Sequence, residues 1–177
     1  MPHNLLITGE SGIGKSTVLD QAVTLMGHRR IAGFLCPKIV GDGTDSGWRI
    51  DGFNGVSGVI AHASIRGRHR MGHFGVDIDL FECCVGSETS ALSRSDVVII
   101  DEIGIIGGWS KTFRNFAERA LDSTIPTVAI VRQESGAFSD QVKSRDDVEI
   151  WTVNREIRDV IPADIARWVE GIDLSIA

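Results

Sequence analysis

The sequence that decides the fold is Gly9-Glu10-Ser11-Gly12-Ile13-Gly14-Lys15-Ser16, which directly follows the short apolar run Asn4–Thr8. It matches the pattern G-x-x-x-x-G-K-[ST], in which glycines allow consecutive backbone N–H groups to turn inward around an anion. The run before the motif predicts a strand, and Ser16–Met26 predicts a helix whose positive end attracts phosphate. This context indicates a phosphate-binding loop rather than a chance glycine-rich turn.

Two side chains of this loop have separate expected roles. The compact charge of Lys15 reaches the β- and γ-phosphates, and the hydroxyl of Ser16 is a ligand for Mg²⁺. We therefore expect Mg²⁺ as the cofactor and a nucleoside triphosphate such as ATP or GTP as the ligand. The predicted nucleotide-binding residues are Gly9, Glu10, Ser11, Gly12, Ile13, Gly14, Lys15, Ser16 and Thr17.

A second motif consists of the apolar strand Val97–Ile100 and the acidic pair Asp101-Glu102. Such a strand delivers Asp101 to the carboxyl edge of the sheet, where it is expected to hold Mg²⁺ through water. Glu102 would then polarise a water for attack on the γ-phosphate, which favours hydrolysis over transfer to another hydroxyl. The pair alone is also consistent with a polar end to a core strand, and only the preceding phosphate-binding loop favours catalysis.

Composition restricts the class of protein. The 177 residues fit one domain spanning 1–177, and 42% hydrophobic with 24% charged residues is ordinary globular usage. The net charge of −6 gives no support to general nucleic-acid binding. No apolar run approaches the ~20 residues of a membrane span. We expect a cytoplasmic protein, a monomer, whose Cys36, Cys83 and Cys84 are buried or half-buried free thiols.

Apolar periodicity predicts strands that alternate with helices, and hence an α/β fold with a mainly parallel sheet flanked by helices. Strands are expected at Asn4–Thr8, Ile31–Val40, Phe74–Leu80, Val97–Ile100, Thr127–Val131 and Val148–Trp151. Helices are expected at Ser16–Met26, at Thr89–Arg94, after an N-cap at Ser110, at Phe138–Ser144, and from Pro162 to Gly171.

Glycine is the compositional outlier, with 20 residues in the chain. The segment from 41 to 75 contains Gly41, Gly43, Gly47, Gly52, Gly55, Gly58, Gly67, Gly72 and Gly75. Within this segment Asn54-Gly55 joins two short apolar runs, Arg49–Phe53 and Val56–Ala61, and predicts a two-residue hairpin turn. We therefore expect an antiparallel hairpin insertion at about 41–75.

The chain resembles the small P-loop nucleoside-triphosphatases of the thermophile type over nearly its whole length. The resemblance rests on TGESGIGKST, Gly33-Phe34, Gly47–Phe53, Met71–Val76, Ile100–Gly104, Ser110 and Asn154-Arg155. It implies slow, Mg²⁺-dependent hydrolysis of several nucleoside triphosphates to diphosphates and phosphate. It also implies a single RecA-like or AAA-like domain.

The chain departs from the family's usual sequence directly after Gly104. The family usually has a lysine and a second glutamate where this chain has Ile105 and Gly107, and it usually has an arginine near the position of Val40. Gly104, Gly107 and Gly108 therefore predict a loosened turn after the acidic pair, which would give weaker or differently specific activity.

Basic side chains supply candidates for contact with the γ-phosphate. Arg132 follows the strand Thr127–Val131, and Arg155 matches the family's asparagine–arginine motif, which makes it the stronger catalytic candidate. A solvated surface position is the alternative for each. The basic run Arg66–Arg70 could dock a phosphate, a polynucleotide or an acidic partner, or could form a solvated hairpin tip.

Three functions remain open from the sequence. The first is a nucleoside-triphosphatase in which Lys15, Asp101, Glu102 and Arg155 are catalytic. The second is a nucleoside or nucleotide kinase that would use Arg66–Arg70 as a lid. The third is a non-hydrolysing nucleotide-binding module associated with regulation or RNA.

Overall fold

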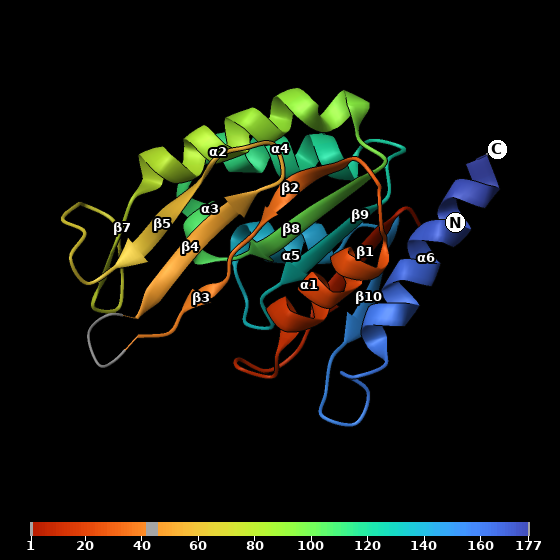
Figure 1. Ribbon diagram of the computed structural model, residues 1–177, viewed down its shortest axis with the longest axis horizontal. Helices are drawn as coiled ribbons and strands as arrows, with labels where there is room; N and C mark the ends of the chain where they lie inside the picture. The colour runs from red at the N-terminus through yellow and green to blue at the C-terminus, as the bar shows by residue number, and fades with distance from the viewer. Residues whose placement is uncertain (1, 42–45, 177) are drawn as a thin grey trace.

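The computed structural model describes residues 2–41 and 46–176 (Figure 1). The strands are β1 (Asn4–Thr8), β2 (Ile31–Leu35), β3 (Lys38–Ile39), β4 (Gly47–Gly52), β5 (Ser57–His62), β6 (Arg70–Met71), β7 (Phe74–Val76), β8 (Val97–Ile103), β9 (Thr127–Val131) and β10 (Val148–Thr152). The helices are α1 (Lys15–Leu25), α2 (Ile78–Ala91), the 3₁₀ turn η2 (Leu92–Arg94), α3 (Ile105–Trp109), α4 (Lys111–Leu121), α5 (Ala137–Lys143) and α6 (Ile161–Ile176).

Within the described residues the strands form one ten-stranded sheet in the order β10-β1-β9-β8-β2-β4-β5-β7-β6, with β3 beside β4. The strands from β10 to β2 in this order pair in parallel. The pairs from β2·β4 onward are antiparallel. The predicted fold class, a mainly parallel sheet flanked by helices with an antiparallel insertion, is confirmed.

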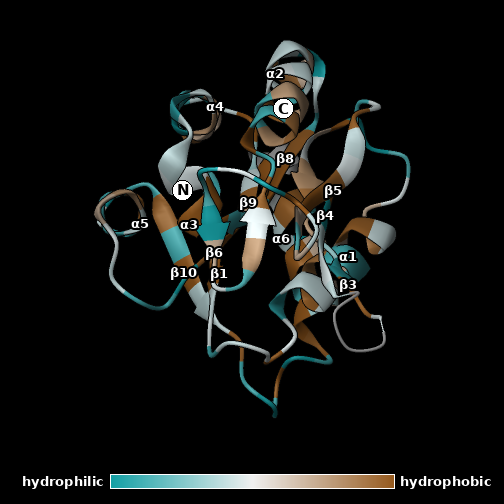
Figure 2. Cartoon of the chain, turned by 90° about the vertical axis from the view of Figure 1, so that its left-hand side faces the viewer, coloured by the Kyte–Doolittle hydropathy of each residue, from teal (hydrophilic) through white to brown (hydrophobic). Residues whose placement is uncertain are grey.

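Alternating side chains of the parallel strands build a separate core on each face of the sheet. In β1, Leu6 packs in the core under α2, α4 and α5, whereas Leu5 and Ile7 pack against α1 and α6. Both faces are thus covered, as parallel sheets require, and Figure 1 shows the helices on either side. Figure 2 shows hydrophobic colour on inner strands such as β8. No helix among the described residues combines the length and apolar character of a membrane span.

The predicted strand Phe74–Leu80 is wrong in its second half. The strand ends at Val76, and α2 begins at Ile78 because Asp77 Oδ1 accepts a hydrogen bond from the backbone N of Leu80 at 2.9 Å. This N-cap outweighs the alternating pattern. The predicted short helix at Thr89–Arg94 is only the end of this longer helix and the η2 turn that follows it.

The predicted two-residue hairpin turn is also wrong. Gly52 and Ser57 bound a longer loop in which Gly55 has a φ of 99° and Asn54 has a negative φ. Asn54 instead donates to the buried carboxylate of Glu88, from its backbone N at 2.8 Å and from its side chain at 2.7 Å. Glu88 also accepts from the backbone N of Gly33 at 2.9 Å. One side chain of α2 therefore joins β2 to the β4–β5 loop.

Three further predictions need smaller corrections. The strand expected at Ile31–Val40 is divided into β2 and β3, and the last helix begins at Ile161 and continues past Gly171. Cys83 is exposed, whereas Cys36 is half-buried and Cys84 is buried, and all three are free thiols. Gly43, one of the glycines assigned to the insertion, lies outside the described residues.

Candidate active site

The phosphate-binding loop connects β1 to α1 at the carboxyl edge of the parallel strands. At the start of the loop, a Cβ at Gly9 would lie 2.6 Å from the carbonyl O of Val153, so the loop packs closely against the end of β10. Gly14 precedes α1 with a φ of 105°, which glycine adopts readily. The start of α1 has no side-chain cap and no acidic residue in its first turn. Its positive end is therefore available to an anion.

Lys15 lies across this loop. Its ammonium Nζ donates to the carbonyl O of Gly9 at 2.8 Å and to that of Glu10 at 2.9 Å. The loop thus carries a cation together with the free helix end, which is the combination that attracts a polyphosphate.

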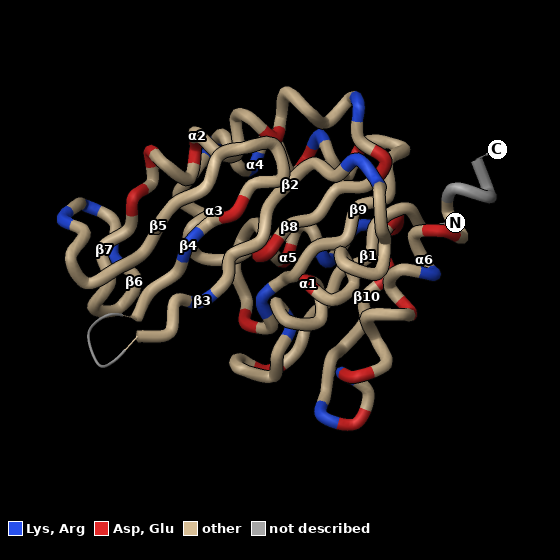
Figure 3. The backbone as a smooth tube through the Cα atoms, viewed as in Figure 1, with Lys and Arg blue, Asp and Glu red and all other residues tan. Residues whose placement is uncertain are grey.

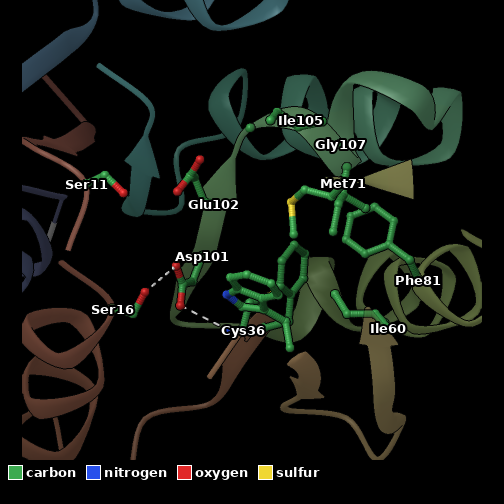
Figure 4. A pocket seen from close by; sticks show the side chains of 14 residues that line it. Ser11, Ser16, Cys36, Ile60, Met71, Phe81, Asp101, Glu102, Ile105 and Gly107 are labelled. Atoms are coloured by element: carbon green, nitrogen blue, oxygen red, sulfur yellow. Dashed lines mark hydrogen bonds between the residues drawn. The ribbon is translucent and has the colours of Figure 1, made fainter. Parts of the chain in front are cut away.

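Asp101 and Ser16 bring the two sequence motifs together. The hydroxyl of Ser16 donates to Asp101 Oδ1 at 3.1 Å, and the backbone N of Cys36 donates to Asp101 Oδ2 at 3.1 Å (Figure 4). Burial raises the pKa of Asp101 to about 6, although both hydrogen bonds act in the opposite direction. A hydroxyl beside a carboxylate supplies the hard oxygen ligands that Mg²⁺ prefers. The residues present therefore fit this ion.

Glu102 follows Asp101 where the pairing of β8 with β9 is irregular, between Ile100 and Ile103. Glu102 is an exposed residue, and its side chain lies on the same side as Ser11 in Figure 4. Partial burial of the carboxylate by the surrounding protein raises the pKa of Glu102, while the positive charges of Lys15 and Arg132 lower it. A Cβ at Gly104 would overlap the Glu102 carboxylate, so the glycine leaves room for this side chain.

The candidate arginines differ in their surroundings. Arg132 follows β9, its Nε lies 3.5 Å from Glu134 Oε2, and its charge acts on the Glu102 carboxylate. Arg155 is exposed in the loop after β10, and no ion pair or side-chain hydrogen bond joins it to another described residue. The basic run Arg66–Arg70 lies between β5 and β7, where Figure 3 shows basic positions at the end of the sheet.

A cavity of about 300 Å³ opens beside the acidic pair. Ser11, Ser16, Asp101 and Glu102 line one side of it, and side chains of the antiparallel strands, α2 and α3 line the other. No sequence motif predicted this apolar side, which includes Phe34, Trp48, Ile60, Met71, Phe81 and Ile106. Phe34, Trp48 and Met71 lie in segments that carry the family resemblance, and this was the only signal for them.

The loosened turn predicted after Gly104 is instead the short helix α3, Ile105–Trp109. A Cβ at Gly107 would overlap the ring of Phe113 in α4. The glycine at 107 thus allows α3 to pack directly on α4. The backbone here is ordered by packing rather than loosened by glycine. As predicted, Ser110 then caps α4, accepting from the backbone N of Phe113 at 3.0 Å.

Comparison with known proteins agrees with this geometry. A family model described as NTPase matches residues 4–166. The chain is 32% identical over 162 residues to nucleoside-triphosphatase THEP1 of Thermotoga sp. strain RQ2, covering 91% of this chain and 92% of that protein. It is 33% identical over 179 residues to nucleoside-triphosphatase THEP1 of Methanopyrus kandleri, covering 96% of this chain and 99% of that protein.

Solved structures show the same fold. The crystal structure of THEP1 from Aquifex aeolicus has a TM-score of 0.82 at 26% identity, covering 94% of this chain and 99% of that one. The solution structure of a human cancer-related nucleoside triphosphatase has a TM-score of 0.76 at 22% identity, covering 95% of this chain and 97% of that one.

Proposed function

The chain belongs to the NTPase family that matches residues 4–166, and from this premise we propose that it hydrolyses nucleoside triphosphates to diphosphates and inorganic phosphate. ATP and GTP are among the proposed substrates, and Mg²⁺ is the proposed cofactor. The observation that carries the proposal is the contact between Ser16 Oγ and Asp101 Oδ1 at 3.1 Å. It joins the phosphate-binding loop to the acidic pair, so that Glu102 would lie next to bound phosphates.

In the proposed site, the backbone N–H groups of the loop and the Lys15 ammonium bind the phosphates. Ser16 and Asp101 would hold Mg²⁺, which when bound neutralises charge on the phosphate oxygens. All of these contacts are to parts that every nucleoside triphosphate shares. This arrangement supports broad base specificity.

Glu102 is the proposed general base. Its carboxylate would accept a proton as a water attacks the γ-phosphorus, and its raised pKa suits a group that must hold that proton. We assign charge stabilisation of the γ-phosphate to Arg132 rather than to Arg155, because Arg132 already acts electrostatically on Glu102. Arg155 is left as a candidate for contact with the rest of the nucleotide.

The proposal is tested by measuring phosphate release from ATP, GTP, CTP and UTP, with and without Mg²⁺, for the wild type and Glu102→Gln. We expect release to depend on Mg²⁺, to vary little with the base, and to fall by ~10²–10⁴ in the variant while nucleotide affinity is retained. Glu170→Gln, an exposed change on α6, is the matched control. Equal rates in Glu102→Gln and the wild type would remove Glu102 from the mechanism.

A further inference from the structure

The cavity beside the acidic pair extends well beyond the room that an attacking water needs. It has a volume of about 300 Å³, at the lower end of the range of ligand pockets in proteins. It reaches from Ser11 and Ser16 of the phosphate-binding loop, past Asp101 and Glu102, to the space between the antiparallel strands and α3 (Figure 4). A molecule placed in its apolar part would lie beyond the acidic pair, as seen from the loop.

The far wall of this cavity is apolar. Trp48 of β4, Ile60 of β5, Met71 of β6, Phe81 of α2 and Ile106 of α3 all line it. Ile60 is 1% exposed and Phe81 2% exposed, so their packing fixes the back of the wall, whereas Trp48, Met71 and Ile106 are half-buried. Such a surface favours an aromatic or aliphatic body over a polar one.

The charge of the lining disfavours an anionic occupant. Among the described residues, the charged side chains that line the cavity are the carboxylates of Asp101 and Glu102, and no lysine, arginine or histidine lines it. In the apolar part of the cavity, a phosphate or carboxylate group would face no cationic side chain of the lining. None of the arginines in Arg66–Arg70 contributes to the lining, so this basic run does not provide one.

We propose that the cavity binds a second substrate, a small uncharged molecule with an aromatic or apolar body and a hydroxyl group, which accepts the γ-phosphoryl group. The inference rests on the proposed function, because the same nucleoside triphosphate is the donor. The hydroxyl oxygen forms a bond to the γ-phosphorus, and its proton passes to the Glu102 carboxylate. The bond from the γ-phosphorus to the bridging oxygen breaks, and the diphosphate leaves with that electron pair. Water takes the place of the hydroxyl when the cavity holds no acceptor, and hydrolysis results.

The test uses γ-labelled ATP with three uncharged probes, 2-phenylethanol, indole-3-ethanol and thymidine. Phenylacetate and thymidine monophosphate are the charged counterparts. Phosphate monoesters and inorganic phosphate are separated and counted. We expect an ester from at least one uncharged probe, formed at least about tenfold faster than any product from the charged ones.

Two variants test the role of the cavity separately from that of the phosphate-binding loop and the acidic pair. Ile60→Phe fills the cavity and is expected to lower ester formation at least about tenfold, while release of inorganic phosphate stays within about twofold. Val59→Phe is the matched control, because Val59 is the neighbouring residue on β5, is 41% exposed and is absent from the lining. Met71→Phe, at a half-buried position, serves where Ile60→Phe does not fold.

The outcomes are distinguishable. Inorganic phosphate as the only product with every probe, at an unchanged release rate, would overturn the acceptor site and leave the nucleoside-triphosphatase. Ester formation that survives Ile60→Phe and Met71→Phe would also overturn it. A chain that neither binds nor cleaves ATP would instead remove the proposed function.

Discussion

The two ends of the candidate site are built in different ways. At the phosphate end, the groups come from one continuous loop and from the end of β8, and Ser16 donates a hydrogen bond directly to Asp101. At the cavity end, single apolar side chains arrive from β4, β5, β6, α2 and α3. The proposed recognition of phosphate therefore depends on local backbone geometry. The shape of the cavity depends instead on long-range packing.

The largest expected effect is at the phosphate end. Lys15→Ala removes the one lysine of the loop, and we expect phosphate release to fall by ~10²–10³ together with a loss of nucleotide affinity. Lys111→Ala, an exposed change at the start of α4, is the control. Titration with a fluorescent nucleotide and a release assay check this. Unchanged nucleotide affinity in Lys15→Ala would contradict a phosphate-binding role for this end of the site.

The second prediction separates the two arginines. Arg132→Ala is expected to lower the turnover number by about 10², because its charge acts on Glu102 and would act on the γ-phosphate. Arg155→Ala is expected to change the Michaelis constant more than turnover. Steady-state kinetics of both variants decide the matter. A larger loss of turnover in Arg155→Ala would reverse the assignment.

The third prediction tests the packing that shapes the cavity end. Gly107→Ala places a methyl against the ring of Phe113, and we expect the free energy of unfolding to fall by ~1–3 kcal/mol. Gly108→Ala is the neighbouring control, since a Cβ there meets nothing within 4 Å. Thermal or urea unfolding of the two variants measures the difference. Equal stability would show that α3 does not pack tightly on α4.

The smallest effect is a difference in thiol reactivity. Burial raises the pKa of Cys84 to about 12 and raises the pKa of Cys36 well above its ordinary value, so both stay protonated thiols at pH 8. Because the thiolate is the nucleophile, we expect iodoacetamide to modify exposed Cys83 at least about tenfold faster. Peptide mass spectrometry follows the three sites. Rapid labelling of Cys36 would show that the phosphate end opens to solvent.

The strands around the loop were predicted well because their sequence signals are local. A motif of eight residues fixes the loop, and the strand Thr127–Val131 matches β9 residue for residue. Phe74–Leu80 misled the prediction, because its alternation suits a strand while Asp77 caps a helix. No local sequence pattern predicts which residues form the cavity wall. Ile60 and Ile106 are separated widely along the chain, and only packing brings them to one surface.

The buried side chain of Glu88 links the parallel part of the sheet to the antiparallel part. Its carboxylate receives N–H groups from Gly33, in the parallel part of the sheet, and from Asn54, in the loop of the antiparallel part. Neither part can separate from α2 without leaving a buried charge short of donors, which is a costly state. The parallel and antiparallel halves, although different in chemistry, should therefore unfold as one cooperative unit, with no independent opening of the insertion.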